Sequence, residues 1–378
     1  MDVRFSDEER WFQQGVRAFL DKELAPRIDV LEENEEFPAD LLPKLGAQGF
    51  LGVGFPDDVG GSGLGHVGVA ILSEELARVA GGVSSSVLTH MIAARIIADV
   101  GTREQRTRYV VPAVQGQILC GIAVTEPNHG SNVAGIETVA HPDGEGYRLQ
   151  GAKMFITNAR LCDVMVVAAK TDRARGRKGI SLFLVNRDNP GYQPGGKLRK
   201  LGWHTSDTAP VSLDGCVVGA DALLGRRDEG FYHIMRGFAF ERIDMAGMSV
   251  GHAQAAYEDA VAYARERVQF DRPIASYQAI RFKLVDMYAA ITAARQLTYW
   301  AAARADQGDP APEDAALAKL YASEVAIQVA GDAVQIHGGA GFMRESRVSR
   351  IYRDVKILTI GGGTSEIQRE IIAKRLGL

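Results

Sequence analysis

Apolar residues near the start of the chain recur with the period of an amphipathic helix. Phe12, Val16 and Leu20 fall on one face, and Ser6 with Glu9 three positions later has the spacing of a capping box. A helix is therefore expected to begin just after Ser6.

The helical period returns at residues 67–79 and 86–100, and EEFPADLLP at 35–43 is expected to open another short helix. The glycine-rich loop at 52–65 begins Gly-x-Gly. It lacks the third glycine and the flanking strand of a dinucleotide-binding fingerprint, so that interpretation is rejected. Residues 1–118 are predicted to form an N-terminal helical domain.

The pattern then changes to short runs rich in β-branched and aromatic residues. Strands are expected at 147–150, 164–169, 180–185 and 210–218, with turn sequences such as DGEG and NPGYQPGG between them. The basic segment RARGRKG is expected to be an exposed hairpin loop. An antiparallel β-barrel or β-sandwich is predicted over residues 119–225.

The last part of the chain regains the helical period in long, alanine-rich segments. These cover 231–267, 277–306, 312–337 and 364–376, with helix breakers between them. Four long helices joined by short links predict an antiparallel four-helix bundle over residues 226–378. The fold class is therefore α+β, in the order helical, β, helical.

Composition excludes several classes of function. The net charge is −4 with no long basic run, which argues against nucleic acid or an anionic membrane surface as the main partner. No apolar run is expected to approach the length of a membrane span. The three scattered cysteines (Cys120, Cys162 and Cys216) favour the reducing cytoplasm. The eight histidines lack metal-binding spacings, so no metal site is predicted.

Two stretches of the middle segment place hydroxyl groups beside an aromatic side chain. GIAVTEPNHGSN carries Thr125 and Ser131 around a turn, and KMFITNA presents Phe155 and Thr157 from the same side of a strand. Such groups suit a flat heteroaromatic ring with nitrogens and carbonyls. Taken singly, each stretch is equally explained by strand-end caps and core aromatics.

TIGGGTSEIQR, residues 359–369, combines three consecutive glycines with the start of a helix. Ser365 and Gln368 have the spacing of a second capping box. A glycine loop that leads into a helix N-terminus offers free N–H groups to an anion or an electron-rich ring. A simple turn before a terminal helix explains the stretch alone.

Three further C-terminal stretches accompany these motifs: YARERVQFDRPIASYQAI, QIHGGAGF and RIYRDVKILTIGGGTSEIQ. Together, over essentially the whole chain and in this order, they resemble the acyl-CoA dehydrogenase family. The resemblance implies non-covalent FAD, an acyl-CoA substrate, and an electron-transfer flavoprotein as electron acceptor. It also implies a homotetramer or dimer in which one subunit completes the flavin site of its neighbour.

The family positions imply which residues contact the cofactor. The isoalloxazine ring is expected near Phe155 and Thr157, and the pyrophosphate and adenosine half near Arg267. The full expected FAD-binding set is Ile122, Val124, Thr125, Ser131, Phe155, Thr157, Arg267, Gln269, Phe270, Gln278, Gln335, Gly338, Gly339, Thr364 and Glu366.

The reaction implied is α,β-dehydrogenation, in which a carboxylate removes the α-proton while a hydride leaves to the flavin. Many family members place that glutamate where this chain has Gly362, and glycine can transfer no proton. In isovaleryl- and long-chain-type members the glutamate precedes an arginine on the first long bundle helix. Glu241–Arg242 occupies that place, so Glu241 is the predicted base. Phe238, Arg242 and Ser131 are the expected substrate contacts.

Other carboxylates and other functions stay open at this point. Asp244, Asp354 and Glu366 are alternative bases. Asn132 stands where the family usually has Asp, and Asp271 where it usually has Gly. The missing glutamate at position 362 and Asp271 motivate a non-catalytic acyl-CoA-binding or partner-binding protein as one alternative. A flavin oxidase or monooxygenase of the same superfamily is the other.

Overall fold

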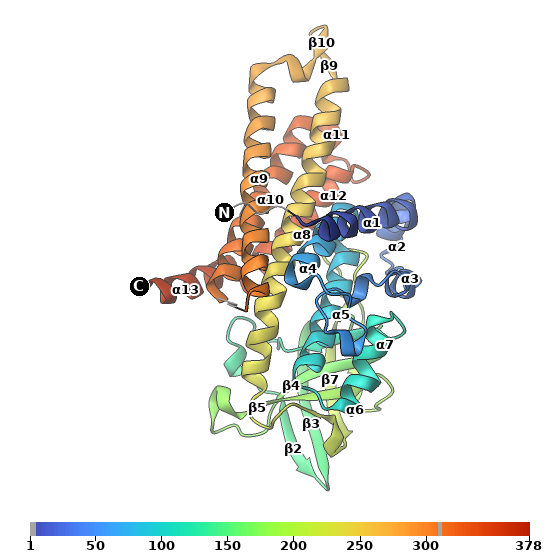
Figure 1. Cartoon of the computed structure of the whole chain (residues 1–378), viewed down its shortest axis with the longest axis vertical. Coiled ribbons are helices and arrows are strands. Elements are labelled where there is room, and N and C mark those ends of the chain that lie inside the picture. The colour runs from blue at the N-terminus through green and yellow to red at the C-terminus, as the bar shows by residue number, and fades with distance from the viewer. Residues whose placement is uncertain (1–4, 309–311) are drawn as a thin grey trace.

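The computed structural model describes residues 5–308 and 312–378. Long helices stand at one end of the molecule and a β-sheet domain at the other, with the N-terminal helices packed beside their junction (Figure 1). The 37-residue helix α8, Gly230–Glu266, runs from the β domain to the far end of the long helices. This arrangement confirms the predicted order of helical, β and helical parts; the domain boundaries stay predictions.

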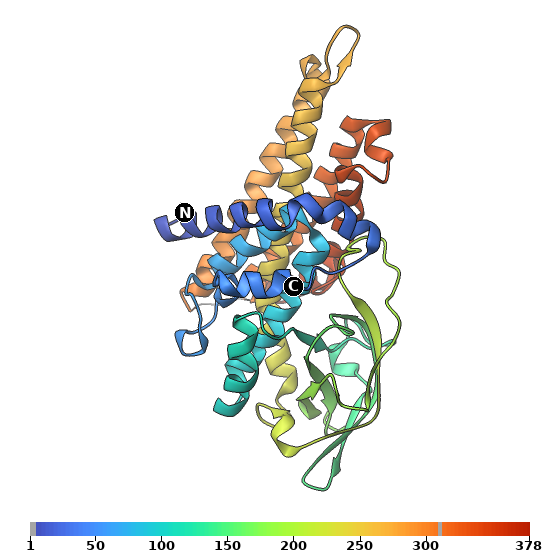
Figure 2. The same ribbon diagram turned by 90° about the vertical axis from the view of Figure 1, so that its right-hand side faces the viewer.

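The N-terminal helices lie across α8 when the molecule is turned (Figure 2). The predicted capping box is confirmed, because Glu9 N donates to Ser6 Oγ at 3.2 Å and Ser6 N donates back to the Glu9 carboxylate. The short helix expected to open at 35–43 begins at Leu41. The helices are α1 (Asp7–Glu23), α2 (Ile28–Asn34), α3 (Leu41–Ala47), α4 (Gly65–Val79), α5 (Gly81–Val100), α6 (Arg103–Gln105) and α7 (Val111–Val114).

Helix α5 begins five residues before the predicted start, with Gly81 and Gly82 inside it. A β-carbon on Gly81 would lie 2.6 Å from the His252 ring, and one on Gly82 would overlap Thr205. These glycines are therefore needed for close packing of the helix, whereas the sequence pattern reads them as a break.

The middle domain holds a mixed sheet in the order β6-β7-β3-β2-β4-β5-β8, with β1 added beside β4. Neighbours on the path are antiparallel except β2 and β4, and β1 also runs parallel to β4. The β domain is confirmed, but the sheet is not purely antiparallel as predicted. Its strands are β1 (Cys120–Ala123), β2 (Val139–Asp143), β3 (Gly146–Thr157), β4 (Val164–Lys170), β5 (Ile180–Asn186), β6 (Tyr192–Pro194), β7 (Thr208–Val218) and β8 (Leu223–Leu224).

Strand β4 is buried on both faces. Val164 and Val166 pack with the N-terminal helices, whereas Met165 and Val167 belong to the interior of the β domain. Alternate side chains of a strand point to opposite faces, so β4 joins the two domains. The RARGRKG segment that links β4 to β5 is largely exposed, as expected for a hairpin loop.

The C-terminal helices are predicted to within one residue at each end. Helices α8, α9 and α10 run side by side, while α13 packs on α10 and leaves the bundle sideways (Figure 1). A two-stranded hairpin joins α8 to α9. The elements are α9 (Gln278–Asp306), α10 (Pro312–His337), α11 (Gly339–Phe342), α12 (Arg347–Asp354), α13 (Ser365–Leu376), β9 (Val268–Gln269) and β10 (Arg272–Pro273).

Helix α5 corrects one expectation from the sequence. An 18-residue stretch of this 20-residue helix has a mean hydropathy of 1.3, so the helix is long and apolar enough to cross a membrane by length and composition. Most of that segment is buried inside the protein, as in the core helix of a globular fold.

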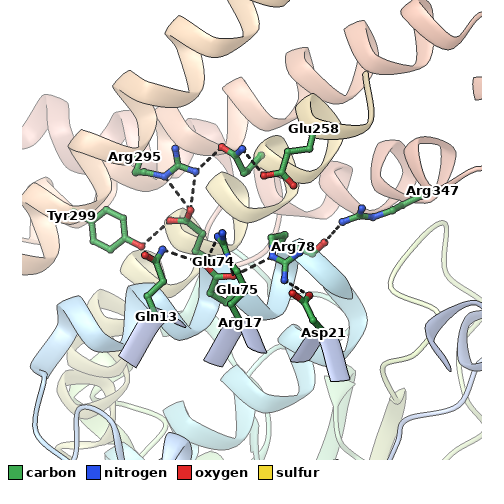
Figure 3. A network of polar contacts seen from close by, with 11 residues as sticks. Gln13, Arg17, Asp21, Glu74, Glu75, Arg78, Glu258, Arg295, Tyr299 and Arg347 are labelled. Carbon is green, nitrogen blue, oxygen red and sulfur yellow. Dashed lines mark hydrogen bonds and ion pairs between the residues drawn. The ribbon is translucent and has the colours of Figure 1, made fainter. Parts of the chain in front are cut away.

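A buried network of charged side chains ties α4 to the bundle and to α1 (Figure 3). Glu74 accepts from both Arg295 Nε and Nη2, at 3.0 and 2.8 Å, and from Tyr299 Oη at 2.7 Å. Glu75 accepts from Arg17 and Arg78. Both carboxylates are almost fully buried, so each depends on its partners to replace the lost water.

Replacing Glu74 with alanine is expected to lower the free energy of unfolding by about 3 kcal/mol, because Arg295 and Tyr299 lose their shared acceptor. Urea unfolding of the purified protein measures this. Asp21→Asn is the control: Asp21 pairs with Arg78 in the same network but is half exposed, and its change should stay within about 0.5 kcal/mol. Equal effects of the two variants would contradict the assignment of the buried pair.

Candidate active site

Glu241 of α8 faces Gly362 in the glycine turn. A β-carbon built on Gly362 would lie 3.6 Å from Glu241 Cδ and 3.7 Å from Oε1. Gly362 has a φ of +60°, and the added β-carbon would overlap Met245 Sδ. The Glu241 carboxylate therefore lies beside the place that a side chain at position 362 would occupy, and Met245 fills that place.

Two buried side chains hold the glycine turn in place by hydrogen bonds to its backbone carbonyl groups. Gln368 Nε2 donates to the carbonyls of Gly362 and Gly363, at 3.0 and 2.8 Å. Lys319 Nζ donates to Gly363 O at 2.7 Å, and Lys319 is completely buried. With these carbonyls bound on one side, the turn presents its other side to Glu241.

The predicted capping box at Ser365 is wrong by one residue. Thr364 is the N-cap and its Oγ1 accepts from Ile367 N, whereas Ser365 donates to Glu324 and Gln368 binds the turn. Both residues serve tertiary contacts that the spacing alone does not indicate.

Burial dominates the electrostatics around Glu241. Desolvation raises the pKa of Glu241, and the neighbouring Arg242 and Lys319 partly oppose that rise. Its Oε2 has no hydrogen-bond partner in the described part of the chain. Burial likewise lowers the pKa of Lys319 to about 8, opposed by the Glu241 charge. A carboxylate held in this way is suited to accept a proton near neutral pH.

The alternative carboxylates have other surroundings. Asp354 Oδ1 accepts, at 2.6 Å, the backbone N–H of Trp203, which lies in the β6–β7 connection. Glu366 is exposed in the first turn of α13, where backbone N–H groups hold its pKa below its usual range. Asp244 is buried three residues beyond Glu241. Of these four carboxylates, Glu241 is the one placed against the turn.

The β domain presents an exposed aromatic ring. Phe155 is 66% exposed and has a φ of +60°, within a register shift of β3 against β7. Buried Ile156 separates it from half-buried Thr157, as the period of two predicts. The bulge itself is not indicated by the sequence. It turns a large apolar ring outward, which is unfavourable unless something covers it.

A buried ion pair holds the two strand segments of this surface together. Lys153 Nζ donates to Glu126 Oε1 at 2.8 Å and to Val124 O at 3.1 Å, and Met154 N donates to Thr125 O. Residues Ile122–Thr125 and Phe155–Thr157, predicted to contact the same ring, therefore lie side by side. Ser131 is exposed on the adjoining turn.

A second group of predicted residues meets at the far end of the bundle. Arg267, Gln269 and Phe270 line a pocket of about 590 Å³ together with Gly338 and Gly339. No atom outside their immediate neighbours lies within 4 Å of a β-carbon built on either glycine, so their backbone is open to a close ligand. Gln278 and Gln335 are exposed nearby but do not line it.

The hairpin at this pocket is strained. Phe270 and Asp271 both have positive φ, +50° and +63°, at the turn between β9 and β10, and Phe270 is 86% exposed. Glycine would adopt these angles freely. Asp271 therefore adds both strain and a carboxylate to the hairpin that follows Arg267.

The two groups of predicted residues lie far apart in one chain. The stretch of α8 from Glu241 to Arg267 is about 39 Å long at 1.5 Å per residue. One dinucleotide cannot reach from the Glu241 end to this pocket within a single subunit.

Three buried residues of the site are not among the sequence-based candidates: Lys319, Met245 and Lys153. Lys319 and Lys153 carried a signal, since a lysine in an otherwise apolar helix face or strand requires a buried partner. Met245 carried none, because a methionine four residues beyond Glu241 is equally expected in a core.

Three sequence models of one family match consecutive parts of the chain. They describe the acyl-CoA dehydrogenase N-terminal domain at residues 6–117, the middle domain at 121–216 and the C-terminal domain at 228–377. The chain belongs to the acyl-CoA dehydrogenase family. It is an enzyme of that class, as predicted.

Individual relatives agree over the full length. The caffeyl-CoA reductase–Etf complex subunit CarC of Acetobacterium woodii is 39% identical, covering 98% of this chain and 99% of its own. The structure of butyryl-CoA dehydrogenase from Megasphaera elsdenii has a TM-score of 0.97 at 37% identity, covering all of both chains. That of the FAD complex of PigA has a TM-score of 0.96 at 29% identity, also covering all of both.

The family is FAD-dependent, and FAD is the predicted cofactor of this chain. The residues fit it. The outward Phe155 ring beside Thr157 suits the flavin, and the pocket with open glycines and Arg267 suits a pyrophosphate. Buried polar atoms without a partner in the described residues, such as Glu241 Oε2 and Arg242 Nε, add unfilled hydrogen-bonding capacity.

Gly362→Ala should lower the free energy of unfolding by about 1–2 kcal/mol, since alanine is strained at positive φ and its β-carbon overlaps Met245 Sδ. Urea unfolding measures the change. Gly361→Ala is the matched control, because its β-carbon would meet Met245 Cε at an ordinary 3.4 Å. A Gly362→Ala variant as stable as the control would show that the turn is not fixed against Met245.

Proposed function

We propose that this chain catalyses the FAD-dependent α,β-dehydrogenation of an acyl-CoA thioester, with Glu241 as the base that removes the α-proton. The observation that carries the proposal is the position of Glu241, whose carboxylate lies within 4 Å of where a side chain on Gly362 would begin. A base on α8 can therefore act at the place that a glutamate at position 362 would occupy.

Each residue has a distinct task in this proposal. Glu241, desolvated and with Oε2 unpaired in the described residues, accepts the α-proton. Gln368 and Lys319 bind the carbonyls of Gly362 and Gly363, which leaves the N–H side of the turn to the thioester oxygen. Bound FAD supplies the hydride acceptor. Thr157 and Phe155 orient its ring, and Phe238, Arg242 and Ser131 are the proposed substrate contacts.

The reverse reaction is the second candidate. The relative named caffeyl-CoA reductase is 39% identical, and the same carboxyl group, when protonated, can return a proton to the α-carbon. Burial raises the pKa of Glu241, which favours the protonated form that the reduction requires.

The proposed partners are an electron-transfer flavoprotein and further copies of this chain. The relative that belongs to an Etf complex supports the first. The second is supported by the long distance between Glu241 and the Arg267 pocket, and by Phe282, Val285 and Tyr288, which leave one face of α9 apolar and exposed. In a homotetramer or dimer, the hairpin at Phe270 would reach the flavin of the adjacent subunit.

Glu241→Gln should retain the yellow flavin but reduce its anaerobic bleaching by acyl-CoA by at least about 10³-fold, because the amide cannot accept the proton. Stopped-flow absorbance measures the rate. Glu370→Gln, exposed on α13 and paired only with Lys374 in the described residues, is the control and should bleach at the wild-type rate. Wild-type bleaching in the Glu241 variant would refute the base, and rapid peroxide formation in air would favour an oxidase.

Lys319→Met should move the pH midpoint of bleaching upward. The rate rises with pH as Glu241 deprotonates. The lysine charge lowers the pKa of Glu241, so its removal raises that pKa, on the order of one pH unit. A pH series of single-turnover bleaching measures the shift, with Lys283→Met on the exposed side of the bundle as control. A midpoint unchanged or lowered would exclude this electrostatic role.

A further inference from the structure

Asp244 is a buried acid without a visible partner. Its exposed fraction is zero, and neither carboxyl oxygen has a hydrogen-bond partner within residues 5–308 and 312–378. A polar group buried in this way is unfavourable unless something satisfies it. By comparison, Asp259 on the same helix contacts Arg347 at 3.1 Å.

The residue lies next to the candidate base. Asp244 follows Glu241 by three positions and precedes Met248 by four, so the three share one side of α8. Met245 and Met248 pack with Leu88 of α5. Asp244 is therefore a polar group in an otherwise apolar seam between α5 and α8 that starts at Glu241.

Helix α5, on the other side of this seam, carries two further buried hydroxyl groups. Ser84 and Ser86 of α5 are fully buried, and the hydroxyl of each lacks a partner in the described residues. The carbonyl of Ser86 accepts from Asn158 Nδ2 at 2.9 Å, directly after Thr157 on the proposed flavin surface. The seam thus adjoins both the proposed base and the proposed flavin surface.

The state of Asp244 decides which chemistry it can recognise. Burial, followed by the nearby Glu241 charge, raises its pKa well above the usual range, which favours the neutral carboxyl group, a group that can both donate and accept a hydrogen bond. A purely hydrocarbon chain would leave it unpaired. A chain that carries an oxygen would not.

We propose that Asp244 is a specificity-determining residue that hydrogen-bonds a hydroxyl or carbonyl oxygen carried on the acyl chain of the substrate. This rests on the proposed function, because it assumes that the acyl chain enters the seam from Glu241. Neighbours three apart on a helix have β-carbons about 5–6 Å apart, which places the oxygen several bonds beyond the α-carbon.

The test compares CoA thioesters that differ by one oxygen: hexanoyl- against 6-hydroxyhexanoyl-CoA, and 3-phenylpropanoyl- against 3-(4-hydroxyphenyl)propanoyl-CoA. The FAD-loaded protein should favour the oxygenated member of at least one pair by about tenfold or more, in Kd from flavin absorbance changes and in kcat/KM. Asp244→Val should abolish that preference, and Asp244→Asn should keep part of it because an amide also donates and accepts. Asp259→Asn is the matched control and should retain the wild-type ratio.

A ratio near one for wild type in both pairs, or the same ratio in wild type and Asp244→Val, would overturn the proposal and leave Asp244 as an acid satisfied by internal water. The binding ratio does not need turnover. If Asp244→Val changes the ratio of the two Kd values but no ester bleaches the flavin, the dehydrogenase function alone is contradicted. If the esters bleach the flavin but the ratio is the same in both proteins, the role of Asp244 alone is contradicted.

Discussion

The close approach of α4 to α8 is the constraint on which the arrangement of the domains depends. A β-carbon on Gly247 would lie 2.7 Å from Ala70 O, and one on Gly251 would overlap Glu74 O, so only glycine at these positions lets the two backbones meet. This contact brings Glu74 within hydrogen-bonding distance of Arg295 and Tyr299. It likewise brings Glu75 within hydrogen-bonding distance of Arg17 and Arg78. The N-terminal helices are thereby fixed against the helix that carries Glu241, which holds this proposed base in a constant relation to both the glycine turn and the β domain.

Three buried carboxyl groups near this contact show how partners decide a role. Glu74 receives three hydrogen bonds and is structural. Glu241 has one oxygen unpaired in the described residues and lies against an open turn, which suits a group that must change its protonation state. Asp244 has both oxygens unpaired there, which suits a group whose partner arrives with the ligand. These three acidic residues are buried to a similar extent, and they differ in their hydrogen-bond partners and therefore in the roles that suit them.

The order of the three parts and the ends of the long helices were predictable, because a 3.6-residue apolar period over 26 to 37 residues has one interpretation. The position of Glu241 beside Gly362 was predictable through the family pattern, while its role as the base stays a prediction. The rest depends on tertiary contacts. Helix α5 includes Gly81 and Gly82 because the neighbouring His252 and Thr205 leave no room for a β-carbon there. The bulge at Phe155 has no signal in the local sequence. Lys319 contacts the glycine turn from a helix that is distant in sequence.

Gly362 and Met245 together explain why the proposed placement of the base on α8 is more than a simple exchange of two residues. The turn needs positive φ at position 362, and the Met245 sulfur fills the space beside it. A glutamate returned to position 362 would need a different residue at 245 and a strained backbone, while Glu241 would remain as a like charge at the same point. Gly362 is therefore coupled by packing to Met245 and lies beside Glu241, so a side chain at position 362 would have to be accommodated by changes at both of its neighbours.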